Sequence, residues 1–382
     1  MEDVNMKFDS RVVRGCQDYS NHLGSVSVPI YQTSTYVHKS AEDMSGYDYT
    51  RCQNPTREEL ENTIAALEGG THGFAFTTGL AANVAVFSLL NAGEHAVISD
   101  DIYGGTYRLI ETIFKRFNVD FTYVDPSDHD AMQAAVRPNT KLFFVETPTN
   151  PMMKVADIAR IADIAHKNHA ILTVDNTFLT PFFQKPLELG ADIVLHSGTK
   201  YLAGHNDTMA GLVAVKDEKL AEEFRNFVKT EGSGLAPFDS FLLLRGIKTL
   251  SLRMRKHEEN AMAVAKWLEK QPKVDKVYFV GLPDSNAYDV TLKQTAGFGG
   301  MISFTVKSVE TAREILRKVE FILFAESLGG TETLITYPMT QTHASIPEEI
   351  RNRIGITDKL LRLSVGIEDV EDIIADLEQA LC

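Results

Sequence analysis

Short, continuously apolar segments alternate with amphipathic segments through the first two thirds of the chain. The apolar segments have the length and the β-branched and aromatic content of strands, at residues 73–77, 95–99, 119–124, 141–146, 170–175, 192–196 and 210–215. Helices are expected between several of them, at residues 80–90, 106–117 and 157–168. Strands that are apolar on both faces are typical of a mostly parallel sheet covered by helices on both sides. The pattern therefore predicts an α/β fold.

The start of one helix is marked clearly. Asn54, Pro55 and Thr56 offer a cap and a first-turn proline, and Thr56 with Glu59 has the spacing of a capping box. Leucine and isoleucine then recur at helical spacing until Gly69. The first 45 residues or so lack such regularity and are expected to form an arm rather than part of the core.

A second domain is expected after residues 230–250. Residues 231–234 are predicted to be flexible, and residues 247–268 to form one long helix. Beyond them the pattern is mixed, with strands expected at 277–280, 300–306 and 334–336 and helices at 309–318, 347–353 and 369–381. The predicted division is an arm at 1–50, a large domain at 51–246 and a C-terminal α+β domain at 247–382.

Composition excludes several classes of protein. With a net charge of −14 over 382 residues, the chain lacks the basic face that nucleic acids and anionic membranes require. Its cysteines, Cys16, Cys52 and Cys382, are odd in number and far apart, which favours a reducing cytoplasm and excludes a cysteine-built zinc site. The most apolar window, residues 80–90, is about half as long as a membrane span, and the N-terminus does not resemble a signal peptide. No metal is expected.

Two residues at strand ends point to a cofactor. Lys200 follows a buried strand together with Ser197 and Thr199, at the edge where parallel sheets bind ligands. Asp175 ends another buried strand, where a carboxylate is costly unless it meets a cation. Pyridoxal phosphate needs a lysine for its Schiff base and an acid for its ring nitrogen. A polar turn at Lys200 and an Asx turn at Asp175 are the alternatives.

Four further features have the same two-sided interpretation. Thr77 to Leu80 place backbone N–H groups at a helix start, which suits a phosphate, or they form a plain turn. Tyr103 offers a ring for stacking, or is a surface tyrosine. The loop 146–151 holds Asn150 as a donor to a ring hydroxyl, or is only stiff. Arg362, inside an apolar strand, suits a substrate carboxylate or an internal salt bridge.

Taken together, these segments resemble the Cys/Met-metabolism family of pyridoxal-phosphate enzymes, which comprises cystathionine γ-synthases, γ-lyases and β-lyases. The resemblance implies the fold of type I PLP-dependent transferases, which is aspartate-aminotransferase-like, with a mostly parallel central sheet and a smaller α+β domain. It also implies a cytoplasmic enzyme. The matching stretches are residues 28–35, 49–51, 54–57, 78–82, 103–106, 146–151, 174–178, 196–200 and 362–366.

The resemblance also implies a role for individual residues. Lys200 would carry the cofactor and move protons, Asp175 would pair the pyridine nitrogen with Thr177 nearby, and Tyr103 would stack on the ring and help to activate the incoming amine. The remaining implied contacts are Gly79, Leu80, Ser197 and Thr199 with the phosphate, Tyr49 and Arg51 with the phosphate of a neighbouring subunit, Asn150 with the 3′-oxygen, and Arg362 and Ser327 with the substrate carboxylate. The shared phosphate site requires a homodimer, and a tetramer is expected.

The choice of reaction depends on fewer residues. Gly105 stands where methionine γ-lyases carry a cysteine, and Glu326 stands where many β-lyases carry an apolar or aromatic residue. Glu326 could hold the distal amino group of cystathionine or cysteine, and Arg108 would line the same entrance. Residues 204–207, 237–240, 324–330 and 336–343 resemble bacterial γ-synthases and O-acetylhomoserine thiolyases. We therefore expect γ-replacement on an O-acylhomoserine by cysteine, with a γ-lyase or β-lyase as the alternative. A homologue without catalysis would need a broken cofactor set, which the sequence does not have.

Overall fold

The computed structural model describes residues 6–16, 22–44 and 46–382. Its larger sheet has the strand order β1-β7-β6-β5-β4-β2-β3, and every predicted strand of this region is found within two residues of its expected ends. The strands from β3 to β6 pair in parallel, whereas β7 is antiparallel to both β6 and β1. The bounds are β1 His72–Phe76, β2 His95–Ser99, β3 Asp120–Val124, β4 Thr140–Glu146, β5 Ile171–Asp175, β6 Ile193–Ser197 and β7 Gly211–Val215.

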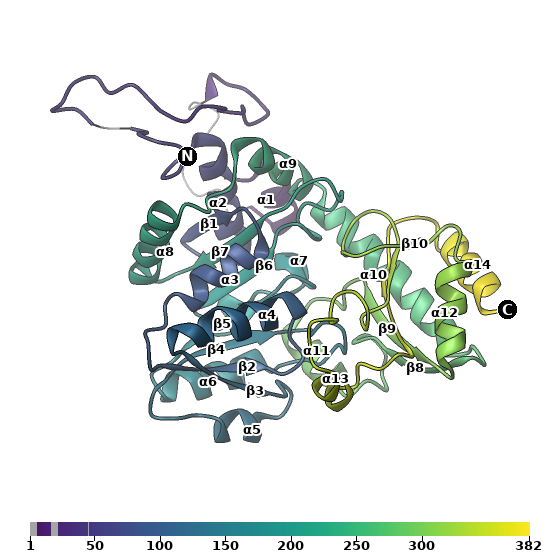
Figure 1. Ribbon diagram of the computed structural model, residues 1–382. Helices are drawn as coiled ribbons and strands as arrows, with labels where there is room; N and C mark the ends of the chain where they lie inside the picture. Colours follow the sequence, from purple (N-terminus) through teal and green to yellow (C-terminus); the bar gives the residue numbers. More distant parts are fainter. Residues whose placement is uncertain (1–5, 17–21, 45) are drawn as a thin grey trace.

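Helices cover both faces of this sheet (Figure 1). One face packs against α2 (Pro55–Glu68), α5 (His129–Ala134) and α6 (Ile158–Lys167). The other packs against α3 (Gly79–Phe87), α4 (Gly104–Thr112) and α8 (Glu218–Glu231). The remaining helices here are η2 (Phe114–Phe117), α7 (Thr180–Phe183), η3 (Pro186–Glu188) and α9 (Pro237–Ile247). The predicted α/β architecture is confirmed.

The C-terminal domain is built on a second sheet of order β10-β11-β12-β9-β8, which is antiparallel except between β10 and β11. The helices α10, α12 and α14 pack on it around an apolar core. The strands are β8 Val274–Tyr278, β9 Met301–Val306, β10 Leu323–Phe324, β11 Leu334–Thr336 and β12 Leu360–Ser364. The helices are α10 Leu250–Leu268, α11 Tyr288–Gln294, α12 Val309–Lys318, α13 Glu348–Ile354 and α14 Val370–Leu381.

Two expectations for the junction between the sheets need correction. The long helix predicted over 247–268 is found as α10, but it begins only at Leu250, because α9 ends at Ile247. The segment 231–234 is not simply flexible, because α8 continues to Glu231 and Gly232 ends it in the left-handed conformation, with φ of 93°. A glycine at that position is a common helix terminator. The predicted domain boundary at 246–247 stays a prediction, and it coincides with the end of α9.

The arm is more anchored than expected. It contains α1 (Phe8–Arg14), and Val12 and Val28 belong to the main apolar core. Other arm residues extend away from the body (Figure 1), and Leu23 and Val37 are almost fully exposed, at 103% and 98%. Among the described helices, none is both long and apolar enough to span a membrane.

The start of α2 fixes the arm to the large sheet domain. Asn54 Oδ1 caps the helix by accepting from Thr56 N at 3.0 Å, and its Nδ2 donates to the carbonyl of Tyr31 at 2.9 Å. Thr56 is not the cap of a capping box as predicted, because its hydroxyl lies beside the arm, donating to the carbonyl of Pro29 and accepting from the N–H of Tyr31. The proline at the first helical position moves the cap two residues upstream.

We predict that Asn54→Ala lowers the free energy of unfolding by about 1–2 kcal/mol, because the helix loses its cap and the arm loses a tether. It should also increase cleavage between residues 29 and 50 in limited proteolysis followed by mass spectrometry. Asp217→Ala is the matched control, because Asp217 caps α8 in the same manner. It should cost similar stability while leaving arm cleavage unchanged, and equal cleavage in both variants would contradict the tether.

Candidate active site

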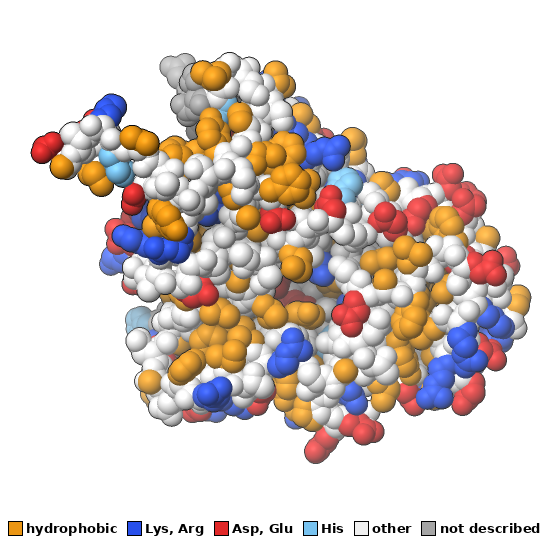
Figure 2. Space-filling view, turned by 45° about the horizontal axis from the view of Figure 1, so that its top comes forward, with side chains coloured by type: hydrophobic (Ala, Val, Ile, Leu, Met, Phe, Trp, Pro, Cys, Tyr) orange, Lys and Arg blue, Asp and Glu red, His pale blue; other side chains and the backbone are white. Residues whose placement is uncertain are grey.

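A cavity of about 290 Å³ lies at the carboxyl ends of the large-sheet strands, where they face the C-terminal domain. Strands β1, β2, β4, β5 and β6 all point toward this edge, because β1 is reversed twice relative to β6 through β7. Figure 2 shows the surface hollowed near its centre, between the two parts of the molecule. The predicted residues that line the cavity are Gly79, Leu80, Tyr103, Asn150, Asp175, Thr177, Ser197, Thr199, Lys200, Glu326, Ser327 and Arg362.

Lys200 is placed as a reactive amine. It follows β6, and its Nζ donates a hydrogen bond to Ser327 Oγ at 2.9 Å. Burial lowers the pKa of Lys200 to about 8, and the positive charge of Arg362 adds to this effect. A neutral amine is the form that attacks an aldehyde, so this environment favours covalent attachment of a carbonyl cofactor.

Asp175 lies at the end of β5, and no positively charged side chain among the described residues forms a hydrogen bond with it. Its Oδ1 accepts from the hydroxyl of Thr177 at 2.5 Å and from the backbone N–H of Thr177 at 3.0 Å. Burial raises the pKa of Asp175, and the bonds from Thr177 oppose the rise. A protonated pyridine nitrogen would supply the missing positive charge, so this residue fits the ring of pyridoxal phosphate.

The start of α3 provides a concave site for a phosphate. Thr78 caps the helix through its hydroxyl, which accepts from Ala81 N at 3.0 Å, and the N–H groups of Gly79 and Leu80 lie in the unbonded first turn. A Cβ at position 79 would lie only 3.1 Å from the Cβ of Ser197. Glycine therefore lets the helix start approach the end of β6, where the hydroxyls of Ser197 and Thr199 line the same cavity.

Glu146 is a cavity residue that the sequence analysis did not single out. Its Oε2 accepts from the N–H of Tyr103 at 3.1 Å and its Oε1 from the N–H of Asn150 at 2.9 Å, so it joins the loops after β2 and β4. It is paired in register with Asp175 on the neighbouring strand. Burial raises the pKa of Glu146, and the adjacent carboxylate of Asp175 raises it further. Its position at a buried strand end, like that of Asp175, could have revealed it.

Arg362 is buried and forms hydrogen bonds with neutral groups. The internal salt bridge that the sequence analysis considered for it is not found among the described residues. Arg362 is 1% exposed, and within the described chain it forms no ion pair. Its guanidinium donates to Asn150 Oδ1 at 2.8 Å, to the carbonyl of Ser327 at 2.8 Å and to Thr336 Oγ1 at 3.1 Å, while its Nε has no partner. A buried cation with a free donor suits a carboxylate ligand.

Three predicted site residues do not line this cavity. Arg108 is exposed near its entrance, where its charge lowers the pKa of Tyr103 against the larger rise caused by burial. Tyr49 and Arg51 line a separate open hollow with Gln32 and Pro237. Arg51 lies over the ring of Tyr49 and donates to the carbonyl of Lys229. Thr78, from the helix start proposed as a phosphate site, also lines the cavity. The lining residues that sequence reasoning missed, besides Glu146, are Asn83, Phe178, Leu195, Met209, Leu328 and Thr342, most of which look like ordinary core or loop residues.

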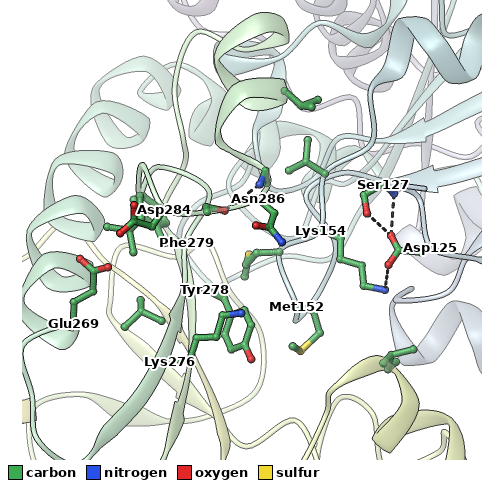
Figure 3. A pocket seen from close by; sticks show the side chains of 18 of the residues that line it. Asp125, Ser127, Met152, Lys154, Glu269, Lys276, Tyr278, Phe279, Asp284 and Asn286 are labelled. Atoms are coloured by element: carbon green, nitrogen blue, oxygen red, sulfur yellow. Dashed lines mark hydrogen bonds and ion pairs between the residues drawn. The ribbon is translucent and has the colours of Figure 1, made fainter. Parts of the chain in front are cut away.

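A larger hollow, of about 760 Å³, lies elsewhere between the two parts of the chain (Figure 3). Its wall from the large sheet carries Lys154, which is already paired with Asp125 at 2.7 Å and Asp100 at 2.9 Å. The opposite wall carries Lys276 and Tyr278, which contact each other. The larger hollow contains none of the predicted cofactor residues, so size alone would have selected the wrong site.

Comparisons with known proteins agree with this geometry. The model of the Cys/Met metabolism PLP-dependent enzyme family matches residues 9–382. A cystathionine gamma-lyase of Bacillus subtilis is 48% identical over 98% of this chain and 99% of its own length. A cystathionine gamma-synthase/O-acetylhomoserine (thiol)-lyase of the same organism is 50% identical over 94% and 92%.

The fold agrees as closely. The crystal structure of cystathionine gamma-lyase from Lactobacillus plantarum, complexed with L-serine, superposes with a TM-score of 0.96 at 44% identity, covering 98% of each chain. A family match over nearly the whole chain, together with a cavity that fits the cofactor, identifies the protein class. The chain belongs to the Cys/Met metabolism PLP-dependent enzyme family and has the type I fold of PLP-dependent enzymes.

Proposed function

We propose that the protein catalyses γ-replacement on an O-acylhomoserine by cysteine, the reaction of a cystathionine γ-synthase, with O-acetylhomoserine thiolyase activity as a possible second capacity. The observation that carries the proposal is the placement of Arg362 and Glu326 in one cavity with Lys200. A buried cation without a counter-ion suits the carboxylate of the first amino acid. The acid at the exposed side suits the ammonium group of a second amino acid.

The cofactor would be held by residues from several strand ends. Pyridoxal phosphate, when bound, acts as an electron sink for the amino acid attached to it. Lys200 would hold it covalently, Asp175 would face its ring nitrogen, and Tyr103 would stack on its ring. The amide nitrogen of Asn150 is left for the 3′-oxygen, because its Oδ1 already accepts from Arg362. The remaining contacts would be Thr177 beside Asp175 and Gly79, Leu80, Ser197 and Thr199 at the phosphate.

Arg362 would orient the substrate by binding its carboxylate. Lys200 would transfer the protons. Ser327, whose hydroxyl accepts from Lys200 and whose carbonyl accepts from Arg362, would fix both groups beside the substrate. Once free, the amine of Lys200, with its pKa near 8, can take the Cα proton and return it later at neutral pH. Tyr103 would help to activate the incoming amine.

The overall reaction balances without a further reactant. The bond between Cγ and the acyl oxygen breaks, a bond between Cγ and the cysteine sulfur forms, and the thiol proton leaves with the released carboxylic acid. Glu326 would hold the cysteine ammonium group while Arg108 lines the entrance.

A cystathionine γ-lyase or β-lyase is the second candidate, because the same cavity would hold cystathionine itself. A relative with 48% identity bears the name cystathionine gamma-lyase. The chain has Gly105, rather than the cysteine of methionine γ-lyases, beside Tyr103. That feature argues against a methionine γ-lyase without separating the synthase from the cystathionine lyases.

We also propose a cytoplasmic homodimer that assembles further into a tetramer, with active sites shared between subunits. Tyr49 and Arg51 lie outside the cavity of their own chain, which is where residues that complete a neighbour's phosphate site would lie. Figure 2 shows apolar side chains gathered over the arm and the surface beside it. Exposed apolar residues on the arm, such as Val26 at 77% and Met44 at 58%, would be covered by the partner.

We predict that purified enzyme forms cystathionine from O-acetyl- or O-succinylhomoserine and cysteine at least about tenfold faster than it degrades cystathionine given alone. The reason is that Arg362 would bind the carboxylate of the O-acylhomoserine and Glu326 the ammonium group of cysteine. Product mass spectrometry on this substrate panel measures both reactions. The opposite ratio would establish the lyase, and no turnover of any substrate would contradict both.

We predict that Glu326→Gln raises KM for cysteine about tenfold, because a charge-assisted contact with the ammonium group is lost. Turnover with sulfide as the thiol should change little, since sulfide has no ammonium group. Glu320→Gln serves as the control, because Glu320 is exposed outside the cavity. Equal losses of activity with cysteine and with sulfide would show that Glu326 does not bind the ammonium group.

We predict that the rate at which cofactor-free enzyme attaches pyridoxal phosphate rises with pH, with its midpoint at about pH 8, the pKa of Lys200, and levels off at higher pH. Below that pH the amine is protonated and cannot attack. Attachment is measured by borohydride trapping and peptide mass spectrometry, with Lys200→Ala as the variant that should trap nothing. A midpoint near about 10.4, the value of an ordinary lysine, would contradict the proposed environment.

A further inference from the structure

A second polar cluster lies directly behind the cofactor edge, on the opposite face of the large sheet. Asp175 and Leu195 are register partners and both line the cavity. Because strand side chains alternate between faces, the next residue along β6, His196, points to the α2 side. His196, Asn176 and Glu68 are fully buried there, each at 0% exposure. We call Glu68, Asn176, Gln184 and His196 the rear cluster.

The centre of the rear cluster is a buried ion pair. His196 Nε2 lies 2.6 Å from Glu68 Oε1, and both side chains are inaccessible to solvent. The same oxygen of Glu68 accepts from Asn176 Nδ2 at 3.0 Å. Glu68 Oε1 therefore joins the ring of His196 to the amide of Asn176, and no water-exposed group takes part in this contact. The imidazole of His196 is the basic group that faces the buried carboxyl group of Glu68.

The rear cluster ties together the strand ends that carry the cofactor residues. Asn176 follows Asp175, and its backbone N–H donates to the carbonyl of Leu195 at 2.9 Å. Its side chain exchanges hydrogen bonds with Gln184, whose Nε2 also donates to the carbonyl of Thr147 at 3.2 Å. The ends of β4, β5 and β6 are therefore fixed from behind by groups that never enter the cavity.

The ion pair also acts on Asp175 through space. Burial raises the pKa of Asp175, whereas the hydrogen bonds from Thr177 and the charge of His196 lower it. Within the described residues, Nδ1 of His196 and Oε2 of Glu68 have no hydrogen-bond partner, so the contact between Nε2 and Oε1 is what holds the two side chains together. A positive charge on the ring behind the sheet would favour the ionised form of Asp175 in front of it.

We infer that the Glu68–His196 ion pair is a positioning unit for the cofactor, which aligns the ends of β5 and β6 and keeps Asp175 as the carboxylate that faces the pyridine nitrogen. Both residues act through Asp175 and the strand ends, without touching the cofactor. The inference rests on the cofactor of the family and is independent of which reaction the enzyme catalyses. A failure of the γ-replacement proposal would leave it standing.

The test compares His196→Gln, Glu68→Gln and the double variant. His196→Gln should raise the dissociation constant of pyridoxal phosphate about tenfold, as loss of an outer partner does at other bound groups. It should also shift the visible absorption band of the bound cofactor, because Asp175, the partner of the ring nitrogen, ionises less readily without His196 behind it. Equilibrium dialysis and absorption spectra measure these quantities without any assay of turnover.

The double variant separates positioning from simple packing. Two glutamines can form a neutral hydrogen-bonded pair, and removing both partners avoids the large cost of leaving one buried charge unpaired. We expect its melting temperature to return toward that of the unmodified enzyme, while the dissociation constant and absorption band stay shifted. If the single variants are insoluble, the double variant carries the test alone.

His95→Gln is the matched control. His95 is a fully buried histidine of the same large sheet, held by the hydroxyls of Thr140 and Thr122 at 2.8 Å each, and it lies outside the cavity. It should lower the melting temperature but change the dissociation constant by less than about twofold. The inference is overturned if His196→Gln binds and absorbs like the unmodified enzyme. It is equally overturned if the double variant restores stability and cofactor binding together.

Discussion

Buried charges at the carboxyl edge of the large sheet are the constraint on which the site depends. Asp175 and Arg362 are held by neutral groups: hydroxyls, a backbone N–H group, a carbonyl and an amide. Because buried charges are costly without counter-charges, this arrangement favours a ligand that carries both signs. A cofactor with a cationic ring nitrogen and an anionic phosphate, joined to an amino acid, meets that requirement. The rear ion pair of Glu68 and His196 applies the same electrostatics from the other face.

The sheet topology brings this chemistry together. Parallel strands deliver every carboxyl end to one edge, so loops that are widely separated in sequence open into the same cavity. The single reversed strand, β7, lies between β6 and β1, so β1 runs parallel to β6. The start of α3, which follows β1, therefore lies at the same edge. The C-terminal domain closes the site with Arg362 on β12 and Ser327 in the loop after β10. One hydrogen bond, from Arg362 to Asn150, joins residues 212 positions apart across this boundary.

Local patterns predicted most of the elements, because strands and amphipathic helices reveal themselves over short windows. These patterns were wrong about helix ends, where neighbouring residues compete to be the cap or the first residue. Thr56 looked like a helix cap, but Pro55 placed the cap at Asn54. The long helix was expected to start at Ile247, but that residue ends the preceding helix and α10 starts at Leu250. The site residues at strand ends were found because a polar side chain after an apolar run is conspicuous. Glu146 was overlooked because its role depends on backbone donors from two loops.

The sequence by itself determined the fold class, the family and most of the predicted site residues that line the cavity, because motif residues and apolar periodicity are local properties that survive without coordinates. Only the tertiary structure decided which side chains contact one another. It showed that Arg362 has amide and carbonyl partners instead of an ion pair, that Tyr49 and Arg51 lie away from their own cavity, and that His196 faces Glu68. Such contacts join segments far apart in the chain, and their electrostatics follow from burial and distance, which no sequence pattern specifies.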